Sequence, residues 1–222
     1  MDFIFTGNTM LTQYESERYS RQIKISGWDI NAQEKLKISS VFVAGAGGLG
    51  SPVIYYLAAA GVGRIIICDN DKIETSNLNR QILYTPSDTG KWKAEAAAEK
   101  ISSFNELVDV RWFTETLGLQ YLDIIKQCDL ILDCLDNFEA RYLLNRMSHE
   151  AGIPMIHSGV SEYYAQMTFL HPGQTPCLEC FIPENLKKET TGTTGAMAGI
   201  AGTIQALEAL KYLTGTGDLL KN

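Results

Sequence analysis

The sequence has few of the features that mark secreted, membrane-spanning or nucleic-acid-binding proteins. It carries 19 basic against 26 acidic residues, a formal net charge of -7, which argues against a nucleic-acid partner held by phosphate neutralisation. Its start, "MDFIFTGNTM", has neither a basic region nor a long apolar run, so we expect no signal peptide. The apolar segment 195–213 contains Gln205, Glu208 and Lys211 and is typical of a buried helix rather than a membrane span.

Cysteine is also scarce, and its five positions do not form the disulfide framework of a secreted domain. Cys68, Cys128 and Cys134 lie in or beside apolar runs, where cysteine behaves as a small buried hydrophobe. We therefore expect a reducing, cytoplasmic compartment. Cys177 and Cys180 form one Cys-x-x-Cys pair, which is half of the four ligands that a structural zinc ion needs. The sequence favours a pair without metal, and zinc completed by a partner subunit is the alternative.

Short β-rich apolar runs alternate with helix-prone segments. Strands are predicted over 40–45, 64–69, 109–113, 129–134 and 153–159, and helices over 49–61, 90–104, 120–127 and 139–152. Because this alternation is typical of a parallel sheet covered on both faces, we predict a Rossmann-like α/β domain. The more regular alternation in 164–173 predicts an added antiparallel strand. Residues 1–38 are interpreted as an N-terminal helical arm that contacts a partner subunit, and 39–222 as the domain itself.

A glycine-rich turn follows the first of these strands. Gly45, Gly47 and Gly50 in "VFVAGAGGLG" form a Gly-x-Gly-x-x-Gly pattern between a strand and a helix. Glycine allows a tight turn and close backbone approach there, and the helix N-terminus favours a phosphate. Asp69 ends the next strand, at about the spacing of an acid that binds a ribose. The pattern predicts a nucleotide site, with a turn used only for packing as the alternative, and it does not identify the nucleotide.

The polar residues that come next favour a triphosphate with a metal over a nicotinamide dinucleotide. The loop "CDNDKIETSNLNRQ" groups two acids with amides and an arginine; these are Asp69, Asp71, Asn77, Asn79, Arg80 and Gln81. Lys93 begins the next helix, and Asp136 follows a strand whose carboxyl end faces the ligand crevice of such a sheet. Asp136 could hold Mg²⁺ beside the phosphates. Taken singly, Lys93 is also compatible with an exposed helix lysine and Asp136 with a helix N-cap.

Seven segments spread over nearly the whole chain carry a resemblance to a known family. They are "YSRQI", "GAGGLGSP", "CDNDKIETSNLNRQ", "GKWKAEAA", "LDCLDNFEAR", "PCLEC" and "IQALEALKYLTG". In this order they resemble the family of ThiF, MoeB and the ubiquitin-activating enzymes. The resemblance implies a domain that binds ATP with Mg²⁺ and joins AMP to a carboxylate.

The resemblance also implies roles for single residues and for a second subunit. It places the phosphates at Gly47 and Gly48, the ribose at Asp69, the triphosphate among Asn77, Arg80 and Lys93, and the metal at Asp136. Arg21 would reach the γ-phosphate of ATP in the partner subunit, which implies a homodimer. The three histidines of the chain are not required by this chemistry.

Two features depart from the family pattern. Fuller relatives carry a second Cys-x-x-Cys pair, which we do not find in this sequence. Many relatives also have a cysteine in the crossover loop before the last helix, and that place falls near Lys188. We therefore expect the reaction to end at the acyl-adenylate or to pass it to another nucleophile.

The sequence leaves the carboxylate substrate open. One candidate is the C-terminal carboxylate of a ubiquitin-like sulfur carrier. The other, slightly favoured, is a small-molecule carboxylate in cofactor biosynthesis, as in the shortened HcgE-type relatives that act on a pyridinol carboxylate. A nicotinamide oxidoreductase and a non-catalytic nucleotide-binding subunit are alternatives of other classes. The "NLNRQ" loop argues against the first, and the presence of Arg80, Lys93 and Asp136 argues against the second.

Overall fold

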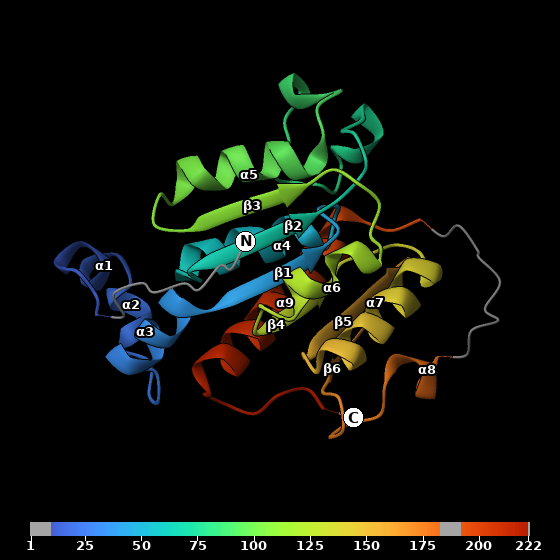
Figure 1. Cartoon of the computed structure of the whole chain (residues 1–222). Coiled ribbons are helices and arrows are strands. Elements are labelled where there is room, and N and C mark those ends of the chain that lie inside the picture. Colours follow the sequence, from blue (N-terminus) through green and yellow to red (C-terminus); the bar gives the residue numbers. More distant parts are fainter. Residues whose placement is uncertain (1–9, 183–191, 222) are drawn as a thin grey trace.

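The computed structural model describes residues 10–182 and 192–221. Within them, six strands form one sheet in the order β3-β2-β1-β4-β5-β6 (Figure 1). The strands are β1 (Ser40–Ala44), β2 (Arg64–Cys68), β3 (Asp109–Phe113), β4 (Leu130–Asp133), β5 (Met155–Ser161) and β6 (Tyr164–Leu170). Neighbouring strands run parallel except for β5 and β6, which are antiparallel. The predicted Rossmann-like fold is confirmed, including the antiparallel strand within 164–173.

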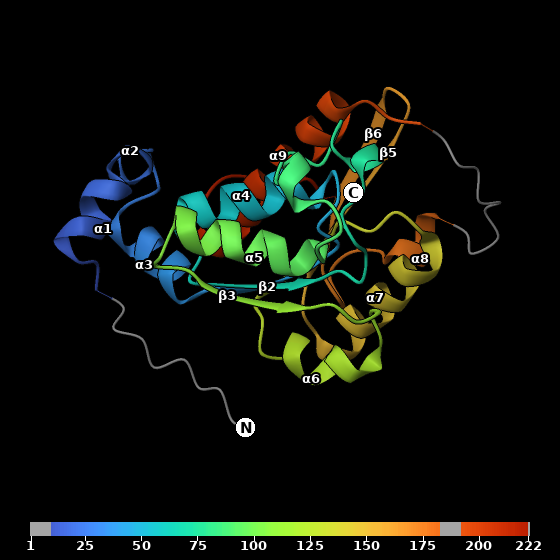
Figure 2. The ribbon, with the colours of Figure 1, turned by 90° about the horizontal axis from the view of Figure 1, so that it is seen from above.

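Helices cover both faces of the sheet. On one face lie α4 (Gly50–Ala60), α5 (Lys93–Phe104) and α9 (Gly195–Thr214), and on the other lie α6 (Leu122–Ile125) and α7 (Phe138–Ala151) (Figure 2). The short elements are η1 (Thr75–Asn77), η2 (Pro86–Asp88), η3 (Leu119–Tyr121) and α8 (Leu178–Phe181). Among the described residues, no helix combines the length and the apolar character that crossing a membrane requires.

The central strand β1 shows why its residues 41–44 are all apolar. Val41 and Val43 belong to the core under α4, α5 and α9, whereas Phe42 and Ala44 belong to the core on the side of α6 and α7. Successive side chains of a strand point to opposite faces, so a strand covered on both sides needs an unbroken apolar run. All five residues of β1 are buried.

The N-terminal segment contains α1 (Gln13–Arg18), α2 (Ser20–Ile23) and α3 (Ile30–Ile38). Ala32 and Leu36 of α3 enter the core under α4 and α9, so this helix is anchored to the domain. In Figure 1, α2 lies at the end of the sheet where β1 begins, away from the turn between β1 and α4.

The sheet topology creates a crevice at the carboxyl ends of β1 and β4. From β1 the chain continues through α4 to β2 on one side, while β4 lies on the other side of β1. Loops that leave these two strands diverge, and such switch points are where open α/β sheets bind ligands. A cleft of about 1830 Å³ lies there, lined by residues of the glycine turn and of the loops after β2 and β4.

Candidate active site

The glycine turn forms the centre of the cleft. Gly45 has a φ of 96°, and a Cβ at this position would lie 2.6 Å from the backbone oxygen of Cys134. A Cβ on Gly50 would collide with the backbone oxygen of Gly45. These two glycines therefore shape the turn, while Gly47 and Gly48 line the cleft and leave it open to a ligand.

Asp69 lies at the end of β2 with its carboxylate fixed to the turn. Its Oδ2 accepts a hydrogen bond from the Ala46 amide at 2.7 Å, and its Oδ1 accepts one from the Asp71 amide at 2.9 Å. Burial raises the pKa of Asp69, against the lowering effects of the Ala46 hydrogen bond and the charge of Lys93. An ionised carboxylate offers about four acceptor positions, so Asp69 can still accept bonds from ribose hydroxyls.

Lys93 and Asp71 bring a cation and an anion to the same wall of the cleft. Lys93 is buried, with 6% exposure, and its Nζ lies 2.7 Å from Asp71 Oδ2. The alternative interpretation of Lys93 as an exposed helix lysine is therefore wrong. Arg80 also lines the cleft, held by hydrogen bonds from Nη1 to the Ser76 carbonyl and to Asn79 Oδ1, both 3.0 Å.

Asn77 does not reach the cleft lining. Its side chain is buried, and its Oδ1 accepts a hydrogen bond from the Glu74 amide at 3.1 Å, which closes the η1 turn. Tyr84, which the sequence did not single out, ties two parts of the site together. Its buried hydroxyl lies 2.8 Å from the Ala46 carbonyl and 3.1 Å from the Lys93 carbonyl, linking the glycine turn to α5.

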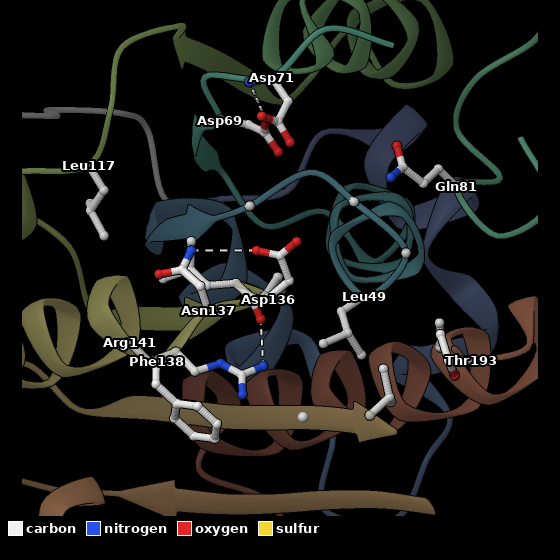
Figure 3. A pocket seen from close by; sticks show the side chains of 18 of the residues that line it. Leu49, Asp69, Asp71, Gln81, Leu117, Asp136, Asn137, Phe138, Arg141 and Thr193 are labelled. Atoms are coloured by element: carbon white, nitrogen blue, oxygen red, sulfur yellow. Dashed lines mark hydrogen bonds between the residues drawn. The ribbon is translucent and has the colours of Figure 1, made fainter. Parts of the chain in front are cut away.

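The loop after β4 supplies the opposite wall. Figure 3 shows Asp136 and Asn137 across from Asp69 and Asp71. The N-cap of α7 is Asn137, whose Oδ1 accepts from the Ala140 amide at 2.9 Å, so the alternative interpretation of Asp136 as that cap is wrong. Asp136 is exposed, and its only hydrogen bond within the described residues is a 3.5 Å contact from Asn137 Nδ2. A carboxylate left free beside a phosphate-type turn suits Mg²⁺, which prefers oxygen ligands and keeps several waters.

A buried group of polar residues lies beneath this wall, and the sequence did not predict their pairing. Asp133 and His157, both fully buried, lie 2.7 Å apart (Oδ2 to Nδ1). Arg141 donates from Nη2 to the carbonyls of Leu135 and Ser158, and its Nε is 3.8 Å from Asp133 Oδ2. Arg141 was part of a matching segment, but the pairing of Asp133 with His157 depends on the register between β4 and β5.

Cys177, Cys180 and Arg21 lie apart from the cleft lining. Cys177 and Cys180 are at the start of α8 with their Sγ atoms 3.3 Å apart. In the described ranges no three His, Cys, Asp or Glu residues are grouped so as to hold a metal, so these residues alone do not fit zinc. Arg21 is exposed on α2, and Lys188 lies outside the described residues.

The sequence matches a family model over residues 19–222, and that family is ThiF. The chain belongs to the ThiF family. It is 38% identical over 214 residues to the mouse adenylyltransferase and sulfurtransferase MOCS3, covering 93% of this chain and 46% of that protein. It is 37% identical over 218 residues to a sulfur carrier protein adenylyltransferase of Thermus thermophilus, covering 93% of this chain and 80% of the relative. A SAMP-activating enzyme E1 of Haloferax volcanii is 38% identical over 92% of this chain and 78% of its own length.

Solved structures agree with this assignment. Escherichia coli MccB with ATP superimposes with a TM-score of 0.82 at 27% identity, covering 95% of this chain and 68% of MccB. MccB with AMPCPP and MccA superimposes with a TM-score of 0.82 at 28% identity, covering 92% of this chain and 66% of MccB. This ThiF chain thus spans about half of MOCS3 and two thirds of MccB. The names of the relatives confirm the family and the adenylyltransferase class that the motifs predicted.

Proposed function

We propose that this ThiF-family chain uses ATP and Mg²⁺ to adenylate a carboxylate, releasing pyrophosphate. The observation that carries the proposal is the convergence of Lys93, Arg80 and Asp136 on one cleft around the Gly47–Gly48 turn. Lys93 and Arg80 lie on the side of the glycine turn and α5, and the carboxylate of Asp136 lies on the opposite side, after β4.

The proposed chemistry requires positioning and charge neutralisation rather than a general base. A carboxylate oxygen attacks the α-phosphorus, the bond from that phosphorus to the bridging oxygen breaks, and pyrophosphate leaves with the electron pair. The nucleophile is already ionised at neutral pH. Mg²⁺ held at Asp136 would supply Lewis-acid stabilisation of the charge on the phosphates. Lys93 and Arg80 are placed to bind phosphate oxygens, and Asp69 to orient the ribose.

For the substrate we propose the C-terminal carboxylate of a peptide or of a small sulfur-carrier protein. The names of the Thermus thermophilus and Haloferax volcanii relatives support this class, as does the pairing of MccB with MccA. The small pyridinol carboxylate expected from the sequence is the second substrate to test. We also propose a homodimer, in which the exposed Arg21 completes the site of the partner subunit.

Pyrophosphate exchange with each carboxylate, combined with mass detection of the acyl-AMP, tests the proposal. We expect ATP-dependent exchange with a sulfur-carrier protein and its loss in Asp136→Ala, while Asp123→Ala, an exposed acid on α6, retains activity. Calorimetry should show binding of ATP with Mg²⁺ and none of NAD. Tight NAD binding without ATP binding, or full exchange activity in folded Asp136→Ala, would contradict the proposal.

A further inference from the structure

The buried pair of Asp133 and His157 has a defined proton arrangement. Asp133 is the last residue of β4 and lies directly opposite His157 of β5 in the sheet. Its Oδ2 is 2.7 Å from His157 Nδ1, and its Oδ1 accepts a hydrogen bond from the Leu135 amide at 3.1 Å. Because an ionised carboxylate can only accept hydrogen bonds, the imidazole proton belongs on Nδ1. His157 Nε2 is then left with a lone pair.

That lone pair faces Gln166, a residue of β6 that lines the cleft. The Nε2 atom of Gln166 is 3.3 Å from His157 Nε2, so the amide nitrogen donates to the ring. Within the described part of the chain, Gln166 makes no other side-chain hydrogen bond. With its nitrogen on the histidine, the amide has its oxygen and one N–H left to offer a ligand.

Gly159 brings Gln166 next to Arg141. Gly159 is the β5 residue opposite Gln166, and a Cβ on it would lie 3.3 Å from both Gln166 Nε2 and Arg141 Nη1. The guanidinium and the amide therefore both border a position that has no side chain. Arg141 Nε is buried and has no hydrogen-bond partner among the described residues. A cation and an acceptor thus border the same part of the cleft.

We propose that Gln166 is a specificity-determining residue that accepts a hydrogen bond from an N–H adjacent to the reacting carboxylate. The pair Asp133–His157 fixes the orientation of the Gln166 amide, so that its oxygen is free to accept a hydrogen bond from the substrate. Arg141 attracts the carboxylate, and Gln166 selects acids that carry a donor beside it, as the last residue of a peptide does through its amide. A site built to accept such a bond discriminates against substrates that lack the donor. The inference rests on the proposed adenylation of a C-terminal carboxylate and adds the residue that selects it.

The test compares two ten-residue C-terminal peptides of a sulfur-carrier protein. They are identical except that an ester oxygen replaces the last amide N–H in one of them. We expect the wild-type protein to prefer the amide peptide in pyrophosphate exchange by about 10-fold in kcat/KM, a typical cost of one unmade hydrogen bond. Gln166→Leu should raise KM for the amide peptide until the two peptides are equal, with KM for ATP unchanged within about 2-fold.

The chain offers a matched control in a second glutamine–histidine contact, between Gln174 Nε2 and His171 Nε2 at 3.4 Å, outside the cleft lining. Gln174→Leu should keep the wild-type preference. A wild-type protein that accepts both peptides equally, or a Gln166→Leu variant that keeps the preference, would overturn the inference while leaving adenylation standing. Exchange with neither peptide, in a protein that binds ATP, would count against the proposed peptide substrate and the inference together.

A spectroscopic measurement tests the positioning role without relying on activity. Nitrogen-15 NMR of the histidine side chains, with His157 assigned by a His157→Gln variant, should show a proton on Nδ1 and none on Nε2. A proton on Nε2 would reverse the amide of Gln166 and refute the proposed orientation. If folded, His157→Gln should also abolish the peptide preference and add no further loss to Gln166→Leu.

Discussion

Lys93 and Asp71 are joined twice, by an ion pair of 2.7 Å between Nζ and Oδ2 and by a hydrogen bond of 2.9 Å from the Lys93 amide to the Asp71 carbonyl. The first residue of α5 is thereby fixed to the loop that follows β2. The ammonium group is buried while the Asp71 side chain is 63% exposed. Lys93 is therefore fixed in the wall of the cleft before ATP binds. A charge that is already in position can stabilise the transition state of phosphoryl transfer without a reorganisation cost.

Lys93→Met should lower pyrophosphate exchange by about 100-fold and weaken ATP binding, because the aliphatic stem remains and only the charge is lost. The variant should still fold, because the Asp71 carboxylate that loses its partner is mostly exposed to solvent. Lys91→Met is the matched control: Lys91 is half exposed and lies 3.4 Å from Asp88 and 3.6 Å from Glu99, and ion pairs of a half-exposed lysine contribute little. Exchange kinetics and calorimetry with ATP provide the measurements. Equal pyrophosphate-exchange activity of the two variants would show that Lys93 has no role in the reaction.

Asp88 predicts a pH-dependent contribution to stability. Burial would raise its pKa, but hydrogen bonds from Lys100 and Thr85 outweigh it and hold the pKa well below the usual value. A group with a depressed folded-state pKa stabilises the fold above its unfolded pKa of about 4, and this contribution is lost as the pH falls. Asp88→Asn should lower the free energy of unfolding by about 1–3 kcal/mol at pH 7. The difference in free energy of unfolding between wild type and variant should become smaller below about pH 4.

Urea unfolding monitored by circular dichroism from pH 7 to pH 3 measures this difference. Asp123→Asn provides the control, since Asp123 is 89% exposed and forms an ion pair with Lys126, the C-cap of the same helix. Its effect should stay below about 0.5 kcal/mol at every pH. If the difference in free energy of unfolding between wild type and Asp88→Asn grew as the pH fell, the lowered pKa of Asp88 would be contradicted.

The parts of the site that could be predicted are those set by local sequence. The turn at Gly45–Gly50 follows a strand and opens a helix, so its position was readable from the pattern of residues, as was Asp69 at the end of β2. Asn77 shows where such reasoning fails. Its spacing suited a ligand contact, but the η1 turn directs its side chain to the Glu74 amide.

The unpredicted part of the site depends on pairing between distant segments. Asp133 and His157 meet because β4 and β5 pair in one register, and Gln166 joins them because β6 pairs antiparallel with β5. Viewed alone, Asp133 fits an ordinary strand end, and His157 and Gln166 fit ordinary strand residues. Their chemistry emerges only from the order of strands, which the alternation of strands and helices does not specify.

The cysteines should separate into two reactive and three unreactive thiols. Burial raises the pKa of Cys68 and Cys128 to about 12 and that of Cys134 well above its usual value. Cys180 is exposed and Cys177 half-buried. Because the thiolate is the reactive form, native protein treated with iodoacetamide at pH 8 should be labelled only at Cys177 and Cys180.

Mass spectrometry of labelled peptides checks this prediction, with guanidinium-unfolded protein as the control in which all five cysteines react. The double variant Cys177→Ser with Cys180→Ser should lose native labelling and retain acyl-AMP formation, since neither residue lines the cleft. Loss of acyl-AMP formation in a folded double variant would show that the pair serves the reaction. Labelling of Cys68, which does line the cleft, would indicate a more open site than the structure has.

The proposed dimer can be tested by mixing two inactive variants. Arg21 is exposed on α2, at the end of the sheet away from the glycine turn (Figure 1). The phosphate that we expect Arg21 to contact therefore has to belong to ATP bound in a second subunit. Arg21→Ala and Asp136→Ala should each abolish pyrophosphate exchange. In a mixed dimer, the site of the Arg21→Ala chain keeps Asp136 and receives Arg21 from its partner. Random re-pairing makes half of the dimers mixed with one good site each, so activity should recover to about a quarter of wild type.

Subunit exchange must be verified in the same sample, by mass photometry or by energy transfer between differently labelled chains. Lys24→Ala is the matched control, because Lys24 is an exposed cation at the end of α2. It should be fully active alone, which would show that loss of a positive charge from this helix is not itself harmful. Verified exchange without recovered activity would mean that Arg21 does not complete the partner's site. Full activity of Arg21→Ala alone would exclude Arg21 from the reaction, whatever the oligomeric state.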